Sequence, residues 1–533
     1  MNISEKILKL RTEAGLSQEA LAEKLGVSRQ SVSKWESGAA LPDTDKIIAM
    51  SDLFKVSTDY LLKADTEVTA PAVEDVPAAA YSAAQPQPVK SGKKKKPVAK
   101  IIALVLVVCI VACGIGVPAY FGGVREAWWA LNGGKIQYSY VLVHGLGGWG
   151  EGGEGINDIS SYWGASTGNL VEYLNSQGHK VYAPSVGPVS SAWDRACELY
   201  AQLTGTTVDY GEAHSKEHNH ARYGRTYDTP LIEGWGTKVN GGQRVKINLI
   251  GHSFGGATVR LLTSLLEYGS EAETSAANTE GEVSPLFEGG KGNWINSVTA
   301  LCAPHNGSSL TEVLNSVGGI VGIKDTTDML INLCFGVAGI TSPSGDFYDF
   351  KLDHFGFASG GYKEAVAAVT ASGNDHAGYD LSPDGAAKLN EQIKLVEGVY
   401  YFSYSYSTTK DGTLLKGQVP VSTTLPVLYP FALAMGSFKG TTANGISIDE
   451  TWQENDGLVS VVSARYPTND AYTESTTDPK DTPEMWEDIK TGIWYVAPTK
   501  DGDHGTVIGL NAHSDTTQKF YVDLFTMVDA LER

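Results

Sequence analysis

The chain has 533 residues, of which 42% are hydrophobic and 19% are charged, so it can form several globular domains. Its five cysteines exclude a disulfide scaffold, and its 60 glycines follow no Gly-X-Y period, which excludes collagen. The formal net charge of −20 excludes a protein that is basic throughout and coats nucleic acid.

The charge is unevenly distributed along the chain. Residues 1–65 carry a net charge of −1, residues 66–100 carry +3, and residues 101–533 carry −22. The sequence therefore consists of three pieces with different electrostatic character.

Residues 1–65 have the pattern of an all-α bundle of short helices. Apolar residues recur at helical spacing, Ser17 precedes one segment as an N-cap, and Gly15 and Gly26 follow two segments as stop signals. The predicted helices cover residues 3–10, 18–25, 29–36, 46–54 and 58–62.

Residues 66–97 are a predicted disordered linker. Ala, Pro, Val and Gln dominate this segment, and without an apolar period it cannot bury enough surface to offset its chain entropy. The linker ends close to four consecutive lysines, residues 93–96.

Residues 98–123 are a predicted transmembrane helix. No charged residue occurs between Ile101 and Val124, and at about 1.5 Å per residue this length spans a hydrocarbon core of about 30 Å. The lysines before it place the N-terminus in the cytoplasm and the C-terminal part outside, in a protein that crosses the cell membrane once. Two alternatives are a buried core helix and cleavage near Ala119, which would release the outer part.

Residues 124–533 alternate short apolar strands with helical patterns. Strands are predicted over 136–143 and 245–250, each followed by a glycine-rich turn, and helices over 169–177 and 257–268. The apolar face of a final helix contains Phe520, Leu524, Val528 and Leu531. This alternation predicts a mostly parallel sheet with helices on both faces.

The segment Gly251-His252-Ser253-Phe254-Gly255 has the form of a nucleophile elbow. It follows a predicted strand and opens a predicted helix, which is the context that the motif requires. In so tight a turn the serine projects above the sheet, and the backbone N–H of Phe254 points at the developing oxyanion. The alternative is an ordinary glycine-rich turn with a passive serine.

A second oxyanion donor is expected after an earlier strand. Residues 141–148, Val-Leu-Val-His-Gly-Leu-Gly-Gly, fit this place, with the backbone N–H of Leu146 as the candidate. Taken alone, the segment would be an ordinary turn at the end of a strand; together with the elbow it is a candidate oxyanion loop.

A serine nucleophile needs a histidine to accept its proton and a carboxylate to hold the tautomer of that histidine, in the order Ser, acid, His for this fold. His504 and Asp456 each lie in a loop before a short apolar run. The spacing leaves His513 open as the base, and Asp380 or Asp384 as the acid.

Many segments between residues 138 and 531 share one family pattern. They are Val143-His144-Gly145, Tyr162-Trp163-Gly164, Val186-Gly187-Pro188, and residues 191–198, 208–211, 220–227, 284–287 and 348–353. In these segments the chain resembles the bacterial lipases of staphylococcal and thermoalkalophilic bacillar type, which are α/β hydrolases that act on triacylglycerols. The resemblance implies that Ser253 is the nucleophile, Asp456 the acid and His504 the base. It also assigns Leu146 and Phe254 to the oxyanion hole.

This family also binds zinc, and the resemblance implies a zinc site here. The matching positions are Asp194, His214, His220 and Asp353. Two imidazoles and two carboxylates suit tetrahedral zinc with no open position, which indicates a structural role. The alternative is that residues 214–220 form a solvated loop.

The family's calcium site looks altered in this chain. Thr506 and Asn511 stand where acidic ligands are expected, and Ala512 replaces a proline. Because the loss of two carboxylates removes the charge that holds a hard cation, we expect calcium to bind weakly or not at all.

Residues 310–343 form a long apolar stretch that resembles the lid of these lipases. A movable amphipathic cover would let one apolar face serve both closed packing and a lipid surface. The alternative is a buried pair of helices.

Residues 16–22, Leu-Ser-Gln-Glu-Ala-Leu-Ala, and residues 27–36, Val-Ser-Arg-Gln-Ser-Val-Ser-Lys-Trp-Glu, resemble the Cro/repressor helix-turn-helix family. The resemblance implies a recognition helix in the major groove. The implied DNA contacts are Gln18, on phosphate, and Ser28, Arg29, Gln30, Ser31 and Lys34. The alternative is a helix-turn-helix that contacts proteins.

Together these features predict a membrane-anchored serine ester hydrolase, similar to triacylglycerol lipases, with a cytoplasmic DNA-binding module. The expected partners are a lipid or ester substrate, DNA through residues 1–65 and the membrane through residues 98–123. A homodimer is a candidate state, because a single spanning helix transmits poorly. One alternative is a transmembrane transcription regulator whose outer lipase-like domain binds lipid as a sensor. Another is a fusion in which only one part is active.

Overall fold

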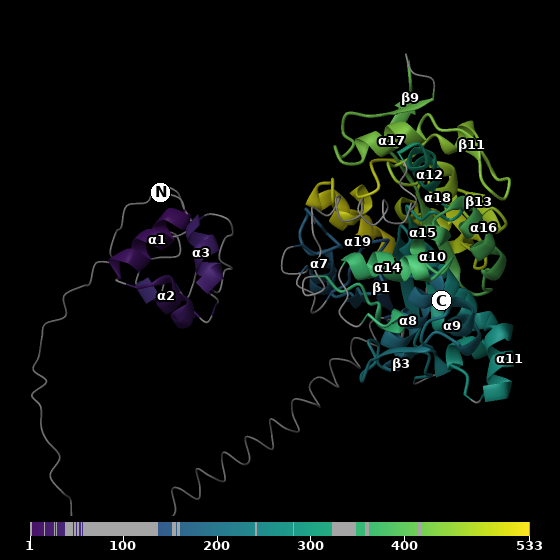
Figure 1. The fold of residues 1–533 in the computed structure, drawn as a ribbon, viewed down its shortest axis with the longest axis horizontal. Coiled ribbons are helices and arrows are strands. Elements are labelled where there is room, and N and C mark those ends of the chain that lie inside the picture. The colour runs from purple at the N-terminus through teal and green to yellow at the C-terminus, as the bar shows by residue number, and fades with distance from the viewer. Residues whose placement is uncertain are drawn as a thin grey trace, which may run out of the picture. The chain divides into compact units, whose positions relative to one another are not determined.

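The computed structural model describes residues 3–37 except 15, 26 and 28, residues 46, 50, 53, 54 and 56, and most of residues 137–531. Within the last range, residues 152–155, 157–159, 240–241, 281, 322–347, 358–361 and 414–416 are not described. The chain divides into two compact units, Met1–Val108 and Cys109–Arg533 (Figure 1).

Among the described residues of the first unit, three helices follow the predicted pattern: α1 (Ile3–Glu13), α2 (Gln18–Leu25) and α3 (Arg29–Ser37). The Ser17 hydroxyl accepts a hydrogen bond from the backbone N–H of Ala20 at 3.1 Å, which confirms the predicted N-cap. The core of this unit contains Ile7, Leu10, Leu21, Ala22, Leu25, Val32, Trp35 and Met50. The predicted helices at 46–54 and 58–62 lie largely outside the described residues.

A bidentate ion pair joins these helices. The Arg11 guanidinium on α1 donates to both carboxylate oxygens of Glu36 on α3, to the second at 3.0 Å. Gln18, at the start of α2, donates to the same carboxylate at 2.8 Å. Burial would raise the pKa of Glu36, but the hydrogen bonds from Arg11 and Gln18 outweigh burial and lower it. One carboxylate therefore connects α1, α2 and α3.

A seven-stranded sheet forms the centre of the second unit. Its order is β13-β14-β7-β6-β5-β1-β2, and every neighbouring pair is parallel, which confirms the predicted mostly parallel sheet. The strands are β1 (Ser139–Val143), β2 (Val181–Tyr182), β5 (Ile247–His252), β6 (Ile295–Leu301), β7 (Tyr400–Tyr404), β13 (Tyr472–Glu474) and β14 (Trp494–Val496).

Helices cover both faces of the sheet, because successive strand residues point to opposite sides. Val141 and Leu249 pack on one face with α8 (Ala192–Thr204) and α10 (Gly255–Tyr268). Leu142 and Ile250 pack on the other face with α7 (Leu170–Ser176) and α19 (Ser514–Leu531). The predicted apolar face of the last helix is buried in this second cluster, at Phe520, Leu524, Val528 and Leu531.

The other described elements lie outside the sheet. Short ribbons pair β3 (Thr207–Asp209) with β4 (Tyr223–Thr226), β8 (Tyr406–Ser407) with β15 (Lys500–Asp501), β9 (Thr409–Asp411) with β10 (Gln418–Pro420), and β11 (Gly440–Thr441) with β12 (Ser447–Ile448). Further helices are α9 (Glu212–His218), α11 (Glu271–Glu280), α12 (Ser309–Val321), α14 (Tyr362–Ala371), α15 (Ala377–Asp380), α16 (Pro383–Gln392), α17 (Tyr429–Met435) and α18 (Val461–Arg465). Short 3₁₀ helices cover Pro285–Glu288, Gly292–Trp294, Asp353–Phe355, Glu450–Trp452, Pro479–Asp481, Pro483–Asp488 and Thr506–Ile508.

Several predicted segments lie outside the described residues. They include the linker at 66–97 and the membrane-spanning helix at 98–123, with the alternative cleavage point near Ala119. Among the residues that the structure describes, no helix is both long and apolar enough to cross a membrane. Of the predicted lid at 310–343, only the part that belongs to α12 is described.

We expect Tyr140→Phe to destabilise the second unit, because Tyr140 joins β1 to α19. Its hydroxyl donates to the Asp529 carboxyl at 2.6 Å, and its ring stacks on Phe525 with 3.6 Å between centroids. The substitution keeps the ring but removes a donor from a largely buried acceptor, at a cost of about 1–3 kcal/mol. Urea unfolding of the full chain measures this cost. Tyr223→Phe, whose residue is 54% exposed, is the control, and equal shifts for the two variants would contradict the prediction.

Candidate active site

Ser253 lies in a tight turn between β5 and α10, with a φ of +55°. The turn requires glycines on both sides of the serine. A Cβ on Gly251 would lie 2.4 Å from the backbone of Gly255, and a Cβ on Gly255 would lie 2.1 Å from the carbonyl oxygen of Val143. The structure therefore has the strand, turn and helix that a nucleophile elbow needs.

Asp456 and His504 form a buried hydrogen-bonded pair. The His504 Nδ1 lies 2.8 Å from the Asp456 Oδ2, and the backbone N–H of His504 donates to the Asp456 carbonyl at 2.9 Å. The other carboxylate oxygen accepts the backbone N–H groups of Leu458 at 3.0 Å and Val459 at 2.7 Å. A carboxylate fixed in this way holds the proton on Nδ1 and leaves Nε2 free to act as a base.

The other candidates from the sequence have different surroundings. His513 is exposed. Asp380 accepts the backbone N–H of Ala192 at 2.8 Å, and Asp384 accepts the backbone N–H of Asn444 at 3.0 Å. The structure thus brings Asp456, and not these carboxylates, to His504.

The loop after β1 packs directly against the nucleophile. A Cβ on Gly145 would lie 2.7 Å from the Cβ of Ser253 and 3.1 Å from its Oγ. Leu146 follows Gly145 in this loop, and Phe254 follows Ser253. The two predicted oxyanion donors therefore come from the two backbone segments that meet at the serine.

Arg195 on α8 stabilises the loop after β1. Its guanidinium is fully buried, and it donates to the His144 carbonyl oxygen, to the Gly187 carbonyl oxygen at 2.8 Å and to the Thr258 hydroxyl at 2.8 Å. Burial lowers the pKa of Arg195 to about 10, so the side chain stays charged at neutral pH. The oxyanion loop is thereby connected to α8 and α10.

Apolar side chains of α12 and α17 gather beside Leu146. Leu310, Val313 and Leu314 of α12 form a buried cluster with Met435 of α17, and Leu146 packs against it. The described part of the predicted lid therefore lies next to the candidate oxyanion loop.

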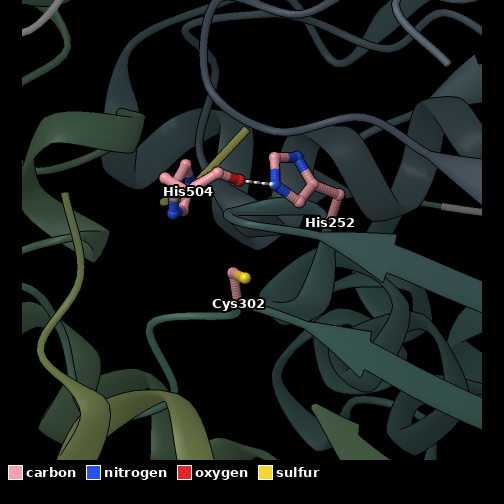
Figure 2. A group of neighbouring side chains, drawn as sticks. All are labelled: His252, Cys302 and His504. Atoms are coloured by element: carbon pink, nitrogen blue, oxygen red, sulfur yellow. Dashed lines mark hydrogen bonds between the residues drawn. The ribbon is translucent and has the colours of Figure 1, made fainter. Parts of the chain in front are cut away.

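His252, Cys302 and His504 lie close together in the candidate active site (Figure 2). Their donor atoms all lie within 4.8 Å of one another, a spacing that could hold a metal ion. Three of the four ring nitrogens are already engaged, however. His252 Nε2 lies 3.0 Å from the His504 carbonyl oxygen, its Nδ1 lies 2.6 Å from the Tyr162 hydroxyl, and His504 Nδ1 is bonded to Asp456. Burial also raises the pKa of Cys302, which keeps it a neutral thiol. We therefore assign these three side chains to the surroundings of the candidate base, His504, and not to a metal site.

A second cluster of buried donors can hold a metal ion. It consists of Asp194, His214, His220 and Asp375. The His214 Nε2 lies 3.2 Å from Asp194 and 3.4 Å from Asp375, and the His220 Nε2 lies 3.3 Å from the Asp375 Oδ2. Two imidazoles and two carboxylates at such separations converge on one point.

The chemistry of these donors fits zinc. His220 Nε2 and Asp375 Oδ2 are both buried and face each other, yet neither makes a well-directed hydrogen bond. Burial would lower the pKa of His214, but hydrogen bonds that it donates to Asp194 and Asp375 outweigh burial and raise the pKa to about 10. A divalent cation would replace the protons that these imidazoles otherwise need to balance two buried carboxylates.

The prediction of Asp353 as a zinc ligand is wrong, because Asp375 occupies that place. Asp353 forms an ion pair with Arg225, which also binds Asp349. Its neighbour His354 points inward instead and lies 3.0 Å from the Asp194 Oδ2. The 3₁₀ turn at Asp353–Phe355 separates the directions of these two side chains. Sequence reasoning missed Asp375, since its loop carries no ligand spacing relative to the histidines.

Neutral groups surround Asp503 in the region of the family's calcium site. The Asn511 amide donates to the Asp503 carboxylate at 2.6 Å, and the Thr506 hydroxyl donates to it at 3.2 Å. Backbone N–H groups of Leu425 and Gly505 donate to the same carboxylate, at 3.0 and 3.2 Å. The two residues that differ from the family pattern thus supply hydrogen-bond donors to this carboxylate.

The predicted DNA-contacting residues lie on or beside α2 and α3. Arg29 and Lys34 are exposed, and Arg29 pairs with Glu19 at 2.9 Å. The Gln18 amide donates to Glu36, so part of its hydrogen-bonding capacity is used inside the bundle. Ser31 is half-buried on α3, whereas Ser28 and the Gln30 side chain lie outside the description.

Comparison with protein families identifies both units. The model of the lipase-like C-terminal domain matches residues 136–530, and a helix-turn-helix model matches residues 7–61. Lipase 1 of Staphylococcus aureus strain MRSA252 is 33% identical over 397 residues, which cover 72% of this chain and 52% of that protein. The chain thus spans about half the length of the curated relatives that it matches.

Solved structures share the fold of the second unit. EstA of Clostridium botulinum is 34% identical with a TM-score of 0.62, over 75% of this chain and 88% of that one. Lipase 1 from Pelosinus fermentans is 35% identical with a TM-score of 0.60, over 75% and 99%. Staphylococcus hyicus lipase is 28% identical with a TM-score of 0.60, over 75% and 98%.

We expect Asp375→Asn to lower the affinity for zinc by about 10–100-fold or more, because it removes a buried anionic ligand. It should also lower the midpoint of thermal unfolding. Asp353→Asn should keep the metal, since Asp353 pairs with Arg225 instead. Elemental analysis of the dialysed full chain and thermal unfolding measure both effects. Loss of zinc from Asp353→Asn, with retention in Asp375→Asn, would contradict the assignment.

Proposed function

The chain belongs to the lipase-like C-terminal domain family, and from this membership we propose that it is a serine ester hydrolase joined to a DNA-binding module. The observation that carries the proposal is the buried Asp456–His504 pair next to the elbow that presents Ser253. A passive turn would need neither a fixed histidine tautomer nor a backbone loop packed against its serine.

In the proposed reaction, Ser253 Oγ attacks the ester carbonyl while His504 Nε2 takes its proton. Asp456 stabilises the resulting imidazolium through Nδ1–H, and the N–H groups of Leu146 and Phe254 stabilise the oxyanion. The tetrahedral intermediate expels the alcohol, which receives the proton from His504. Water, which gives a proton to His504, then attacks the acyl-enzyme. The acyl C–Oγ bond breaks, His504 returns that proton to Ser253 Oγ, and the carboxylic acid leaves.

Lipids and shorter esters are the proposed substrates. The apolar cluster of α12 and α17 beside Leu146 offers an acyl chain an apolar surface at the reacting carbonyl. The name lipase, which the relative from Staphylococcus aureus and the structure from Pelosinus fermentans carry, supports this substrate class. Zinc, held by Asp194, His214, His220 and Asp375, is proposed as a structural ion that fixes the loops around α8.

The membrane anchor is proposed from the sequence. Residues 98–123 would hold the hydrolase outside the membrane and the helix-turn-helix in the cytoplasm. This arrangement would place an ester substrate and DNA on opposite sides of the membrane.

We expect the full chain in detergent to hydrolyse p-nitrophenyl esters. Ser253→Ala should lose nearly all turnover, and Asp456→Asn should lose about 10³–10⁴-fold in kcat because His504 adopts the wrong tautomer. Asp384→Asn and His513→Ala change the alternative residues and serve as controls that keep activity. A folded wild type that turns over no ester of any chain length would refute the proposal that the chain is an esterase. It would favour the alternative in which the lipase-like domain binds lipid as a sensor.

We expect the full chain to select a sequence from a random duplex DNA pool. Arg29→Ala and Gln30→Ala should weaken binding by about 1–3 kcal/mol each and relax the preference at the bases that they read. Gel shifts at several salt concentrations measure both effects. Lys410→Ala, in the other unit, removes one positive charge as a control, and failure to select any sequence would favour protein contacts by the helix-turn-helix.

A further inference from the structure

A chain of hydrogen bonds runs from the candidate oxyanion loop to the candidate base. The backbone N–H of Gly145 donates to the Tyr162 hydroxyl at 2.9 Å. That hydroxyl lies 2.6 Å from His252 Nδ1, and His252 Nε2 lies 3.0 Å from the His504 carbonyl oxygen. Figure 2 shows this last bond between the His252 ring and the backbone of His504. The chain thus joins three loops that are distant in sequence.

The two ends of this chain fix every proton in between. A backbone N–H can only donate and a backbone carbonyl can only accept. His252 Nε2 must therefore carry a proton to bond the His504 carbonyl oxygen. The neutral ring then has a lone pair at Nδ1, which accepts the Tyr162 proton, while the Tyr162 oxygen accepts the Gly145 N–H.

Burial keeps His252 neutral in this arrangement. The residue is 2% exposed, and burial, followed by the nearby His504, lowers the pKa of His252 well below its usual range. A neutral imidazole has two tautomers, and only the one with the proton on Nε2 can bond the His504 carbonyl oxygen. Without the Tyr162 proton at Nδ1, the other tautomer would turn a lone pair toward that oxygen.

We propose that Tyr162 and His252 are positioning residues that hold the backbone of His504 through a locked tautomer of His252. The inference rests on the proposed function, in which His504 is the base. The Asp456 carbonyl holds the N–H of His504 at 2.9 Å, and His252 holds its carbonyl at 3.0 Å, so the residue is fixed on both sides. The same chain anchors Gly145, which packs on Ser253.

The neutral state of His252 also suits the reaction. The rings of His252 and His504 lie 4.9 Å apart between centroids. When His504 becomes an imidazolium, a charged neighbour at this distance would oppose it. A hydroxyl donor at Nδ1 holds His252 in the neutral form without introducing a charge.

A double-mutant cycle tests whether Tyr162 acts through the tautomer of His252. Tyr162→Phe keeps the ring, which packs against Trp149 and Trp163, and removes the hydroxyl, which donates to His252 and accepts the Gly145 N–H. We expect it to lower kcat by about tenfold, as for one misaligned hydrogen bond, with KM changed less than about twofold. In His252→Gln the amide N–H₂ can donate to the His504 carbonyl oxygen without any tautomer choice. Adding Tyr162→Phe to His252→Gln then changes no tautomer and removes the acceptor of the Gly145 N–H, so it should cost clearly less than Tyr162→Phe costs in the wild type.

Multiplicative losses in this cycle would overturn the proposal, because they would mean that Tyr162 acts independently of His252. Tyr268→Phe is the matched control. Its residue is 48% exposed, its hydroxyl bonds the Leu395 carbonyl oxygen, and it should leave kcat unchanged.

Nitrogen NMR of the full chain, labelled at its histidines, reports the tautomer of His252 without any substrate. The resonance that disappears in His252→Gln identifies His252. It should report the Nε2–H tautomer in the wild type and a mixture in Tyr162→Phe. If His252 is in the Nδ1–H tautomer in the wild type, the proposal that Tyr162 fixes the Nε2–H tautomer is wrong. A wild type with the expected tautomer but no ester turnover would refute only the proposed function.

Discussion

The buried guanidinium of Arg195 determines where the loops of the candidate active site lie. A fully buried cation must have its N–H groups satisfied, because an unpaired donor with this charge would be very costly. Arg195 meets this need with the carbonyl oxygens of His144 and Gly187 and the hydroxyl of Thr258. The oxyanion loop, the following loop and α10 consequently share one donor group. Their common position allows Gly145 to pack on Ser253.

The first turn of α8 connects the candidate active site to the candidate metal site. Ser191 caps the helix, and Asp194 and Arg195 follow as neighbours in the chain. Asp194 points to the imidazoles of His214 and His354, whereas Arg195 points to the oxyanion loop. A metal that fixes Asp194 would thus also fix the backbone that carries Arg195. This geometry explains how an ion with no open position could support catalysis without taking part in it.

The net charge of the first unit is a poor guide to the charge of its exposed helix, α3. Glu36 is nearly buried and is neutralised by Arg11 inside the bundle. Arg29 and Lys34 are exposed on α3, although Arg29 also pairs with Glu19. The Arg11–Glu36 pair adds nothing to the net charge of −1 for residues 1–65, and α3 carries two basic residues with Glu36 as its one carboxylate. The relevant quantity for DNA is the local charge of α3.

The sequence by itself determined the features that depend on neighbours in the chain. Periodic apolar residues predicted α2 and α10 close to their observed bounds and the buried face of α19. The glycines around Ser253 indicated the elbow, because a turn is specified by the residues that form it. Local pattern left Asp456 open against Asp380 and Asp384, and the family resemblance selected Asp353 where the structure has Asp375. Only the tertiary structure decided the partners of His504, the fourth metal ligand and the chain from Gly145 through Tyr162 to His252. Each of these depends on side chains that folding brings together from distant segments. The spacing of residues along the chain does not predict such contacts.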